Sequence, residues 1–271
     1  MNHMQEQNWK DECGITSSSF LHQIGPGKGP MTIMDLPKIA RDELGMRILD
    51  INTNSLGSIE PDHAERLRAE VDRTGCIVTN IKLNQRDIDM NHADPAERER
   101  ALAVYRKSVD AAAILGARWV RPLPPDEKPD MQIHIDGYRA LADYAATNDI
   151  QVIVEEYGWM RGDPDSVPTL IDAVDRGLAA SPDTGSWDDD ARYEGLARCF
   201  PLAVTCDYKA FVLSADGEHT DYDLRRCWQL GRDTGFRGPW CFEHWNESLP
   251  DLLRELRMLK DMIGSWSATD E

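Results

Sequence analysis

The sequence predicts a single (β/α)8 barrel of the TIM type. Short runs rich in β-branched residues alternate with longer stretches of helical period, and eight such runs can be distinguished. The chain has 271 residues, close to the ~250 residues typical of such a barrel. Strand–helix repeats imply right-handed crossovers and a parallel sheet, which eight units can close. No Gly-x-Gly-x-x-Gly motif follows the first strand, which argues against a dinucleotide-binding fold.

The elements alternate regularly along the chain. Strands are expected at residues 14–20, 46–52, 77–83, 118–123, 151–156, 178–183, 202–208 and 240–243. Helices are expected at residues 35–44, 62–74, 95–115, 132–148, 167–176 and 250–263, with helix-sized gaps after the sixth and seventh strands. The barrel should therefore occupy residues 13–264, between a polar segment at 1–12 and a tail at 265–271.

The amino-acid composition limits which binding partners and which cellular location can be expected for this chain. The formal net charge is −18, and this charge repels phosphate backbones and anionic lipids, so neither nucleic acid nor a membrane is an expected partner. The six cysteines are scattered without a C-x-x-C pair, which is typical of a reducing compartment. The start of the chain lacks an apolar signal-peptide region, and no run of eighteen apolar residues occurs. A cytoplasmic location is expected.

Carboxylates stand at the ends of several predicted strands, where a barrel carries its active site. They are Asp50 on the second strand, Glu155 and Glu156 on the fifth, Asp183 on the sixth, Asp207 on the seventh and Glu243 on the eighth. Only one of Glu155 and Glu156 can face the barrel axis, because side chains alternate along a strand. Each carboxylate alone could be a helix cap or another structural group. Together they need a counter-charge, and a hard divalent ion such as Mg²⁺ or Mn²⁺ would supply it.

Motifs in the second half of the chain carry a family resemblance. They are Glu155-Glu156-Tyr157-Gly158, Asp183-Thr184-Gly185-Ser186, residues 205–210 (TCDYKA), and Gly235 and Gly238 ahead of Glu243. The helix stretch 111–117 (AAAILGA) running into Val120-Arg121 fits the same pattern. In their order and spacing, over residues 14–259, these motifs resemble the xylose isomerase-like barrel superfamily, in particular the sugar phosphate isomerase/epimerase family.

The resemblance implies a metal site. Glu155, Asp183 and Glu243 match family metal ligands, and Asp207 stands where the family has a histidine. Asp207 as the fourth ligand would give an all-carboxylate site, which favours Mn²⁺ or Mg²⁺, with Co²⁺ also open. The alternative is that this branch has lost or remodelled metal binding.

The resemblance also implies catalytic and substrate-binding roles. Glu155 and Glu243 match the acid–base pair that moves a proton next to a metal-polarised carbonyl. Lys209 would contact a substrate oxygen, or else pair with Asp207. Expected substrate contacts are His22 in the first loop, and Trp159, Trp187 and Trp245, whose rings would stack on sugar faces or fill the core between loops. His244 should point away from the axis, and His63, His92, His134 and His219 are expected at the surface.

Several functions remain open on this basis. The leading hypothesis is a metal-dependent isomerase or epimerase of a carbohydrate or related polyol ketone. A lyase or dehydratase acting on a keto-sugar, keto-glycoside or inosol could use the same site. A non-catalytic sugar-binding or assembly subunit is a third alternative, and an endonuclease ranks low because the chain lacks a basic groove and further histidine ligands. The sequence does not fix the oligomeric state, and a homo-oligomer is one expectation.

Overall fold

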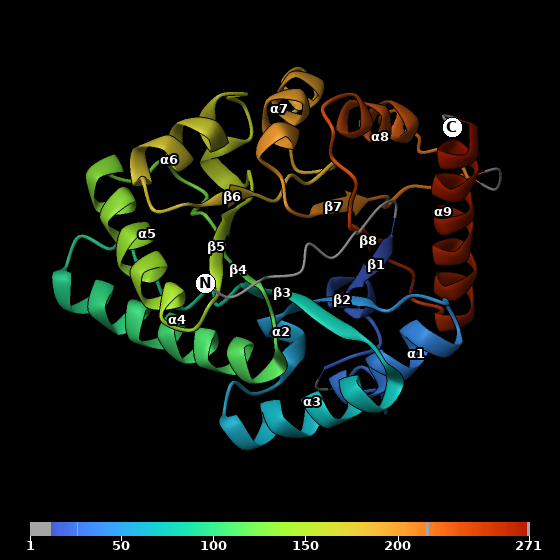
Figure 1. Ribbon diagram of the computed structural model, residues 1–271, viewed down its shortest axis with the longest axis horizontal. Helices are drawn as coiled ribbons and strands as arrows, with labels where there is room; N and C mark the ends of the chain where they lie inside the picture. The colour runs from blue at the N-terminus through green and yellow to red at the C-terminus, as the bar shows by residue number, and fades with distance from the viewer. Residues whose placement is uncertain (1–11, 26, 215–216, 270–271) are drawn as a thin grey trace.

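Eight parallel strands curl into a barrel that α-helices surround (Figure 1). The computed structural model describes residues 12–25, 27–214 and 217–269. The strand order is β6-β5-β4-β3-β2-β1-β8-β7, and each strand pairs in parallel with its neighbours in this order. Parallel bridges Ala180–Ala203 and Asp183–Asp207 join the two ends of this order. The predicted TIM barrel is therefore confirmed.

Several strands are shorter than predicted, most of all β1, β6 and β7. The strands are β1 (Cys13–Thr16), β2 (Ile48–Asn52), β3 (Ile77–Leu83), β4 (Trp119–Pro122), β5 (Gln151–Val154), β6 (Ala179–Ala180), β7 (Cys206–Lys209) and β8 (Trp240–Glu243). Pro182 has no N–H to give to a ladder, which helps to explain why β6 ends early. Pro201 lies in a 3₁₀ turn (Phe200–Leu202), so β7 begins later than predicted. Another 3₁₀ turn (Ser17–Phe20) replaces the second half of the first predicted strand.

The helices follow the predicted rhythm and fill the two gaps. They are α1 (Leu36–Asp42), α2 (Thr53–Leu56), α3 (Pro61–Thr74), α4 (Pro95–Leu115), α5 (Met131–Ala146), α6 (Ser166–Val174), α7 (Arg192–Cys199), α8 (Leu224–Asp233) and α9 (Leu249–Thr269). The Asp94 side chain accepts the Ala96 N–H at 2.9 Å and starts α4, which Gly116 ends at φ 74°. The last helix continues into the segment predicted as a tail. The predicted polar segment 1–12 lies outside the described residues, except for Glu12.

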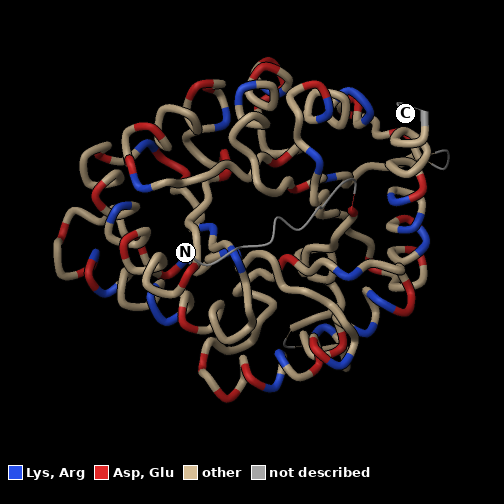
Figure 2. Tube along the Cα trace, viewed as in Figure 1, with Lys and Arg blue, Asp and Glu red and all other residues tan. Residues whose placement is uncertain are grey.

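The outer helices carry charges of both signs (Figure 2). The strands, in contrast, are nearly all buried. One aromatic cluster packs α7, α8 and the barrel together, with Phe236 and Trp240 at 4.9 Å between ring centroids and Phe200 at 5.7 Å from Trp240. Cys76, Cys199, Cys206, Cys227 and Cys241 are buried thiols that form no disulfide. No helix in the described part of the chain is long and apolar enough to cross a membrane.

His134 is buried, so the prediction that it lies at the surface was wrong. Its ring sits on α5 edge-on to Tyr138 and Trp159, with centroids 5.0 and 5.9 Å away, and Nδ1 lies 2.6 Å from Oδ1 of Asn91. Burial lowers the pKa of His134 to about 4, against a smaller opposing effect of Asp89. The neutral ring is thus favoured by the fold, and protonation costs stability.

We expect His134 to make the fold acid-sensitive. A pKa depressed from 6.5 to about 4 gives stability that is present above pH 6.5 and is lost as the pH falls toward 4. Between pH 7 and pH 5 the wild type should lose about 2 kcal/mol more unfolding free energy than His134→Gln. Urea unfolding at the two pH values measures this difference. An identical loss of unfolding free energy in the wild type and in His134→Gln would contradict the conclusion that His134 makes the fold acid-sensitive.

Candidate metal centre and active site

Three carboxylates converge where β5, β6 and β7 end. Glu155 follows β5, Asp183 follows β6, and Asp207 lies within β7. One oxygen of each lies within 4.8 Å of the others, and all three residues are buried. Asp183 and Asp207 also face each other in a parallel bridge, which sets their spacing through the backbone. We refer to Glu155, Asp183 and Asp207 as the triad.

Glu243, the fourth expected ligand, lies beside the triad rather than within it. It ends β8 in register with Lys209 of β7. Its Oε1 is 3.5 Å from Nζ of Lys209, and its Oε2 is 3.6 Å from Nζ of Lys82. The Glu243 and Lys209 side chains are 12% and 15% exposed, whereas the triad carboxylates are at most 4% exposed. Glu243 and Lys209 are therefore the charged groups of this site most open to a substrate.

Each triad carboxylate pairs with a cation of its own, and of these Lys82 and Arg121 are fully buried. Nζ of Lys209 lies 2.6 Å from Oδ2 of Asp183, and Nζ of Lys82 lies 2.7 Å from Oδ1 of Asp207. Nε of Arg121 lies 2.7 Å from Oε2 of Glu155. Lys209 therefore pairs with Asp183, and not with Asp207 as one alternative from the sequence predicted. Lys82 on β3 and Arg121 on β4 were not predicted as site residues, although each is a cation within a strand expected to be buried.

The site still carries more negative than positive charge. Six buried carboxylates, namely Asp50, Glu155, Glu156, Asp183, Asp207 and Glu243, stand against the cations Lys82, Arg121 and Lys209. Burial raises the pKa of Glu155, and it raises the pKa of Asp207 well above the ordinary value despite the nearby Lys82. Burial is the largest effect on Asp183 and would raise its pKa, but the charge and hydrogen bond of Lys209, the Gly185 N–H and the charge of Lys82 together outweigh it, so the pKa of Asp183 is lowered. A further cation would relieve the remaining repulsion.

The triad has oxygen atoms to offer such a cation. Oδ2 of Asp207 is buried without a hydrogen-bond partner. Oε2 of Glu155 is close to Arg121 but is not aligned with its N–H as a hydrogen bond. Buried carboxylate oxygens without donors are the ligands that Mg²⁺ and Mn²⁺ prefer. The residues present therefore fit a hard divalent metal.

Hydrogen bonds fix Asp183 of the triad. The Glu156 carboxylate accepts the Asp183 N–H, with its two oxygens at 3.1 and 3.3 Å. Asp183 in turn accepts the Gly185 N–H at 2.7 Å and the Ser186 hydroxyl at 2.9 Å. Glu155 thus joins the triad while Glu156 supports the end of β6, in keeping with the predicted alternation. These bonds hold Asp183 in one orientation before any ligand arrives.

The predicted substrate residues are spread over different environments. His22 is exposed in the segment after β1, and Trp159 is half-buried with Nζ of Lys128 5.3 Å from its ring centroid. Trp245 is 39% exposed and stacks on Phe211 at 4.0 Å. Trp187 is only 1% exposed, and a Cβ at Gly195 would lie 2.4 Å from its ring. This close packing places Trp187 in the core, so we retain a stacking role only for Trp159 and Trp245.

His244 connects the barrel to the last helix. Its Nε2 lies 2.7 Å from Oε2 of Glu255 on α9, and its Nδ1 contacts the carbonyl oxygen of Ala210. The ring therefore points away from the barrel axis, as the alternation along β8 predicts. This contact fixes α9 beside the site and contributes no group to it.

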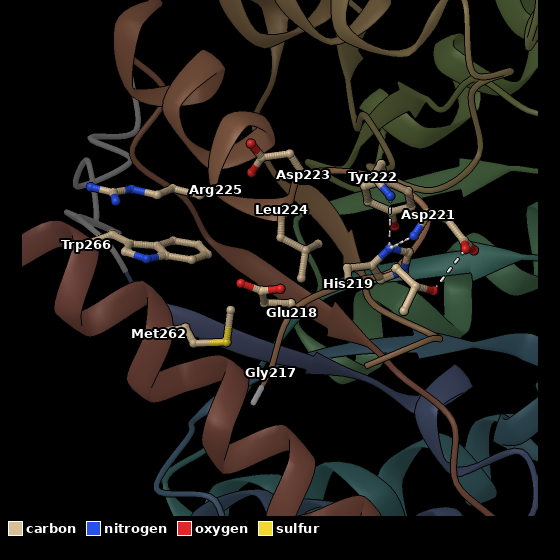
Figure 3. Close-up of a pocket in the computed structure, with 11 residues that line it drawn as sticks. Gly217, Glu218, His219, Asp221, Tyr222, Asp223, Leu224, Arg225, Met262 and Trp266 are labelled. Carbon is tan, nitrogen blue, oxygen red and sulfur yellow. Dashed lines mark hydrogen bonds between the residues drawn. The ribbon is translucent and has the colours of Figure 1, made fainter. Parts of the chain in front are cut away.

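Two cavities lie at different places around the barrel. A cavity of about 200 Å³ lies among the segments that follow β3, β4 and β5, and Arg86, Asp126 and Tyr157 line it. A larger cavity of about 540 Å³ lies between residues 217–225 and α9. Figure 3 shows the larger one, with Met262 and Trp266 of α9 opposite the loop. No triad residue lines either cavity, although Tyr157 of the smaller one stands only two residues after Glu155.

Comparison with known proteins identifies the family. Residues 42–262 match the sequence model of the xylose isomerase-like TIM barrel family. A sequence search of curated proteins found no match.

Three solved structures illustrate the likeness. D-psicose 3-epimerase from Clostridium cellulolyticum H10, solved with D-tagatose, has a TM-score of 0.72 at 14% identity over 94% of this chain and 98% of its own. A Mycobacterium smegmatis xylose isomerase-like TIM barrel protein in complex with magnesium has a TM-score of 0.65 at 19% identity, over 94% and 97%. A probable 3-DHS dehydratase from Bacillus anthracis has a TM-score of 0.68 at 15% identity, over 92% and 98%. These likenesses concern the fold, and the match over residues 42–262 shows that the chain belongs to the xylose isomerase-like TIM barrel family.

Proposed function

We propose that this protein is a divalent-metal-dependent isomerase or epimerase of a carbohydrate or related polyol ketone. The observation that carries the proposal is the convergence of three buried carboxylates beside the more exposed Glu243 and Lys209. Mn²⁺ or Mg²⁺ would be held by the triad of Glu155, Asp183 and Asp207. Among relatives of the same fold, one was solved with magnesium and one is an epimerase, which supports the assignment.

The proton transfer follows from the positions of the charged groups. When bound, the metal would polarise the substrate carbonyl as a Lewis acid. Glu243 takes the proton from the adjacent carbon, because it is the most exposed carboxylate of the group. The Lys209 ammonium, 3.5 Å from Glu243, donates a hydrogen bond to a substrate oxygen. Glu155 then acts as the partner acid that returns a proton.

A lyase or dehydratase is the second candidate. The same proton removal expels a leaving group if one stands β to the carbonyl. A probable dehydratase shares this fold, which favours keeping this candidate. A sugar-binding subunit without activity would need neither Glu243 nor Lys209 at the mouth of the site.

Solvent exchange at carbon distinguishes these functions. The purified protein with Mg²⁺ would be incubated in D₂O with ketoses, keto-glycosides and inosols, and the products followed by NMR. Deuterium at the carbon next to the carbonyl, with the carbon skeleton intact, supports isomerisation or epimerisation. A released group supports the lyase. Sugar binding with no exchange in any substrate would overturn both enzymatic proposals.

We expect metal to stabilise the fold. At a Mn²⁺ concentration 100 times Kd, ligand binding adds about 2.7 kcal/mol of unfolding free energy. For a chain of this length this corresponds to a Tm increase of about 5 °C. Thermal unfolding with Mn²⁺ and with EDTA measures it, and Asp183→Asn serves as the control that should not respond. An equal Tm increase in wild type and variant would place the metal elsewhere.

A further inference from the structure

Lys82 lies fully inside the barrel, where a lysine needs a reason. It is the second-last residue of β3, and its side chain is 1% exposed. In the strand order β3 and β7 stand on opposite sides of the barrel, and the side chain crosses from one to the other. A buried ammonium is costly unless it is paired, so its partners indicate what it does.

The partners of Lys82 come from four other strands. Its Nζ donates to Oδ1 of Asp207 at 2.7 Å and to Oγ1 of Thr16 at 3.4 Å. It also lies 3.6 Å from Oε2 of Glu243 and 3.9 Å from Oδ2 of Asp50. Asp207 is the closest of these partners and the only one that belongs to the triad.

The Asp207 carboxylate is divided between two tasks. Oδ1 is held by Lys82, whereas Oδ2 is buried without a partner. A carboxylate fixed by a cation at one oxygen presents the other in a defined direction. An outer partner of this kind orients a ligand and balances its charge.

We propose that Lys82 is a positioning residue for metal binding, which orients Asp207 and balances its charge so that Oδ2 is presented to a metal in the triad. Lys82 itself does not touch the substrate, because its ammonium is buried below the mouth of the site. This inference rests on the proposed function, since it assumes that the triad binds a divalent metal. It assigns a function to a residue that the strand-end carboxylate pattern alone did not reveal.

The test is a double-mutant cycle on Mn²⁺ affinity, measured by isothermal titration calorimetry of the full chain. Lys82→Met should weaken Mn²⁺ binding by about 10–100-fold, the usual effect of losing a partner of a metal ligand. Adding Lys82→Met to Asp207→Asn should change the affinity of Asp207→Asn by less than about threefold, because Lys82 acts through Asp207. Lys107→Met removes the same charge from the exposed face of α4 and should leave the affinity unchanged.

The outcomes separate the possible explanations. If Lys82 only repelled the metal, Lys82→Met would bind Mn²⁺ more tightly than the wild type. If Lys82 only stabilised the fold, the Tm of Lys82→Met would fall while its Mn²⁺ affinity stayed unchanged. Either result would overturn this inference but leave the proposed function standing. If Lys82→Met does not fold, Asp207→Asn and the double variant are compared instead. The double variant lacks both charges of the Lys82–Asp207 pair, so it leaves no buried charge of that pair without its partner. A much weaker double variant would overturn the inference. No Mn²⁺ binding by the wild type would remove the metal-dependent function together with the inference.

Discussion

Replacing Glu243 with Gln is expected to slow solvent-deuterium exchange into the substrate by about 10²–10⁴-fold. The substitution keeps the size of the side chain but removes the group that accepts the proton. Mn²⁺ binding should persist, because the Glu243 oxygens contact Lys82 and Lys209 rather than the triad. NMR exchange rates at saturating Mg²⁺, together with calorimetric Mn²⁺ titration, measure both quantities.

Glu247→Gln is the matched control for this experiment. Glu247 lies four residues further along, in the segment that follows β8, and is exposed, so the exchange rate should be unchanged. An exchange rate within about threefold of wild type in Glu243→Gln, far short of a general-base effect, would show that another group removes the proton.

Replacing Arg121 with Met is expected to cost about 3–5 kcal/mol of unfolding free energy, because it leaves Glu155 buried without its cation. Arg121 is 2% exposed, and its Nη1 also donates to Oδ1 of Asn84 at 2.8 Å. Burial is the largest effect and would lower the pKa of Arg121, but Glu155 together with the more distant carboxylates of the site outweighs it, so the pKa is raised. Urea unfolding of the metal-free protein at pH 7 measures the loss.

Two further variants make this prediction specific. Arg121→Met combined with Glu155→Gln should recover much of the stability, because no buried charge is then left unpaired. Arg47→Met breaks the more exposed pair with Glu12, at 40% and 27% exposure, and should cost less than about 1 kcal/mol. If Arg121→Met lost no more unfolding free energy than Arg47→Met, this result would contradict a stabilising role of the buried Arg121–Glu155 pair.

The strand pattern predicted most of the fold because alternation of short apolar and helical segments is a local signal. Residues 77–83 and 240–243 were predicted with the observed bounds. The extent of β6 depends on how Pro182 and the neighbouring strand limit pairing, which a strand's own composition does not reveal. Helices α7 and α8 are short, and their apolar positions are interrupted by arginines, so only gaps of suitable length indicated them.

The site was predicted in part, for a physical reason. Strand ends in a barrel lie at one face, so the carboxylates of Glu155, Asp183 and Asp207 could be expected together. Whether the Glu243 side chain joins these three carboxylates depends on the side chains that it contacts inside the barrel, and these are the lysines Lys82 and Lys209. Lys82 and Lys209 come from β3 and β7, and nothing in their sequence separation indicates that both approach Glu243.

The central claim is that the triad holds one divalent metal, and calorimetric titration of Mn²⁺ into metal-free protein tests it most directly. The wild type should bind one Mn²⁺ per chain. Asp183→Asn should weaken this binding by more than the about 10–100-fold that loss of an outer partner costs, because Asp183 is itself a ligand. No Mn²⁺ bound by the wild type, or equal affinity in wild type and Asp183→Asn, would contradict the claim.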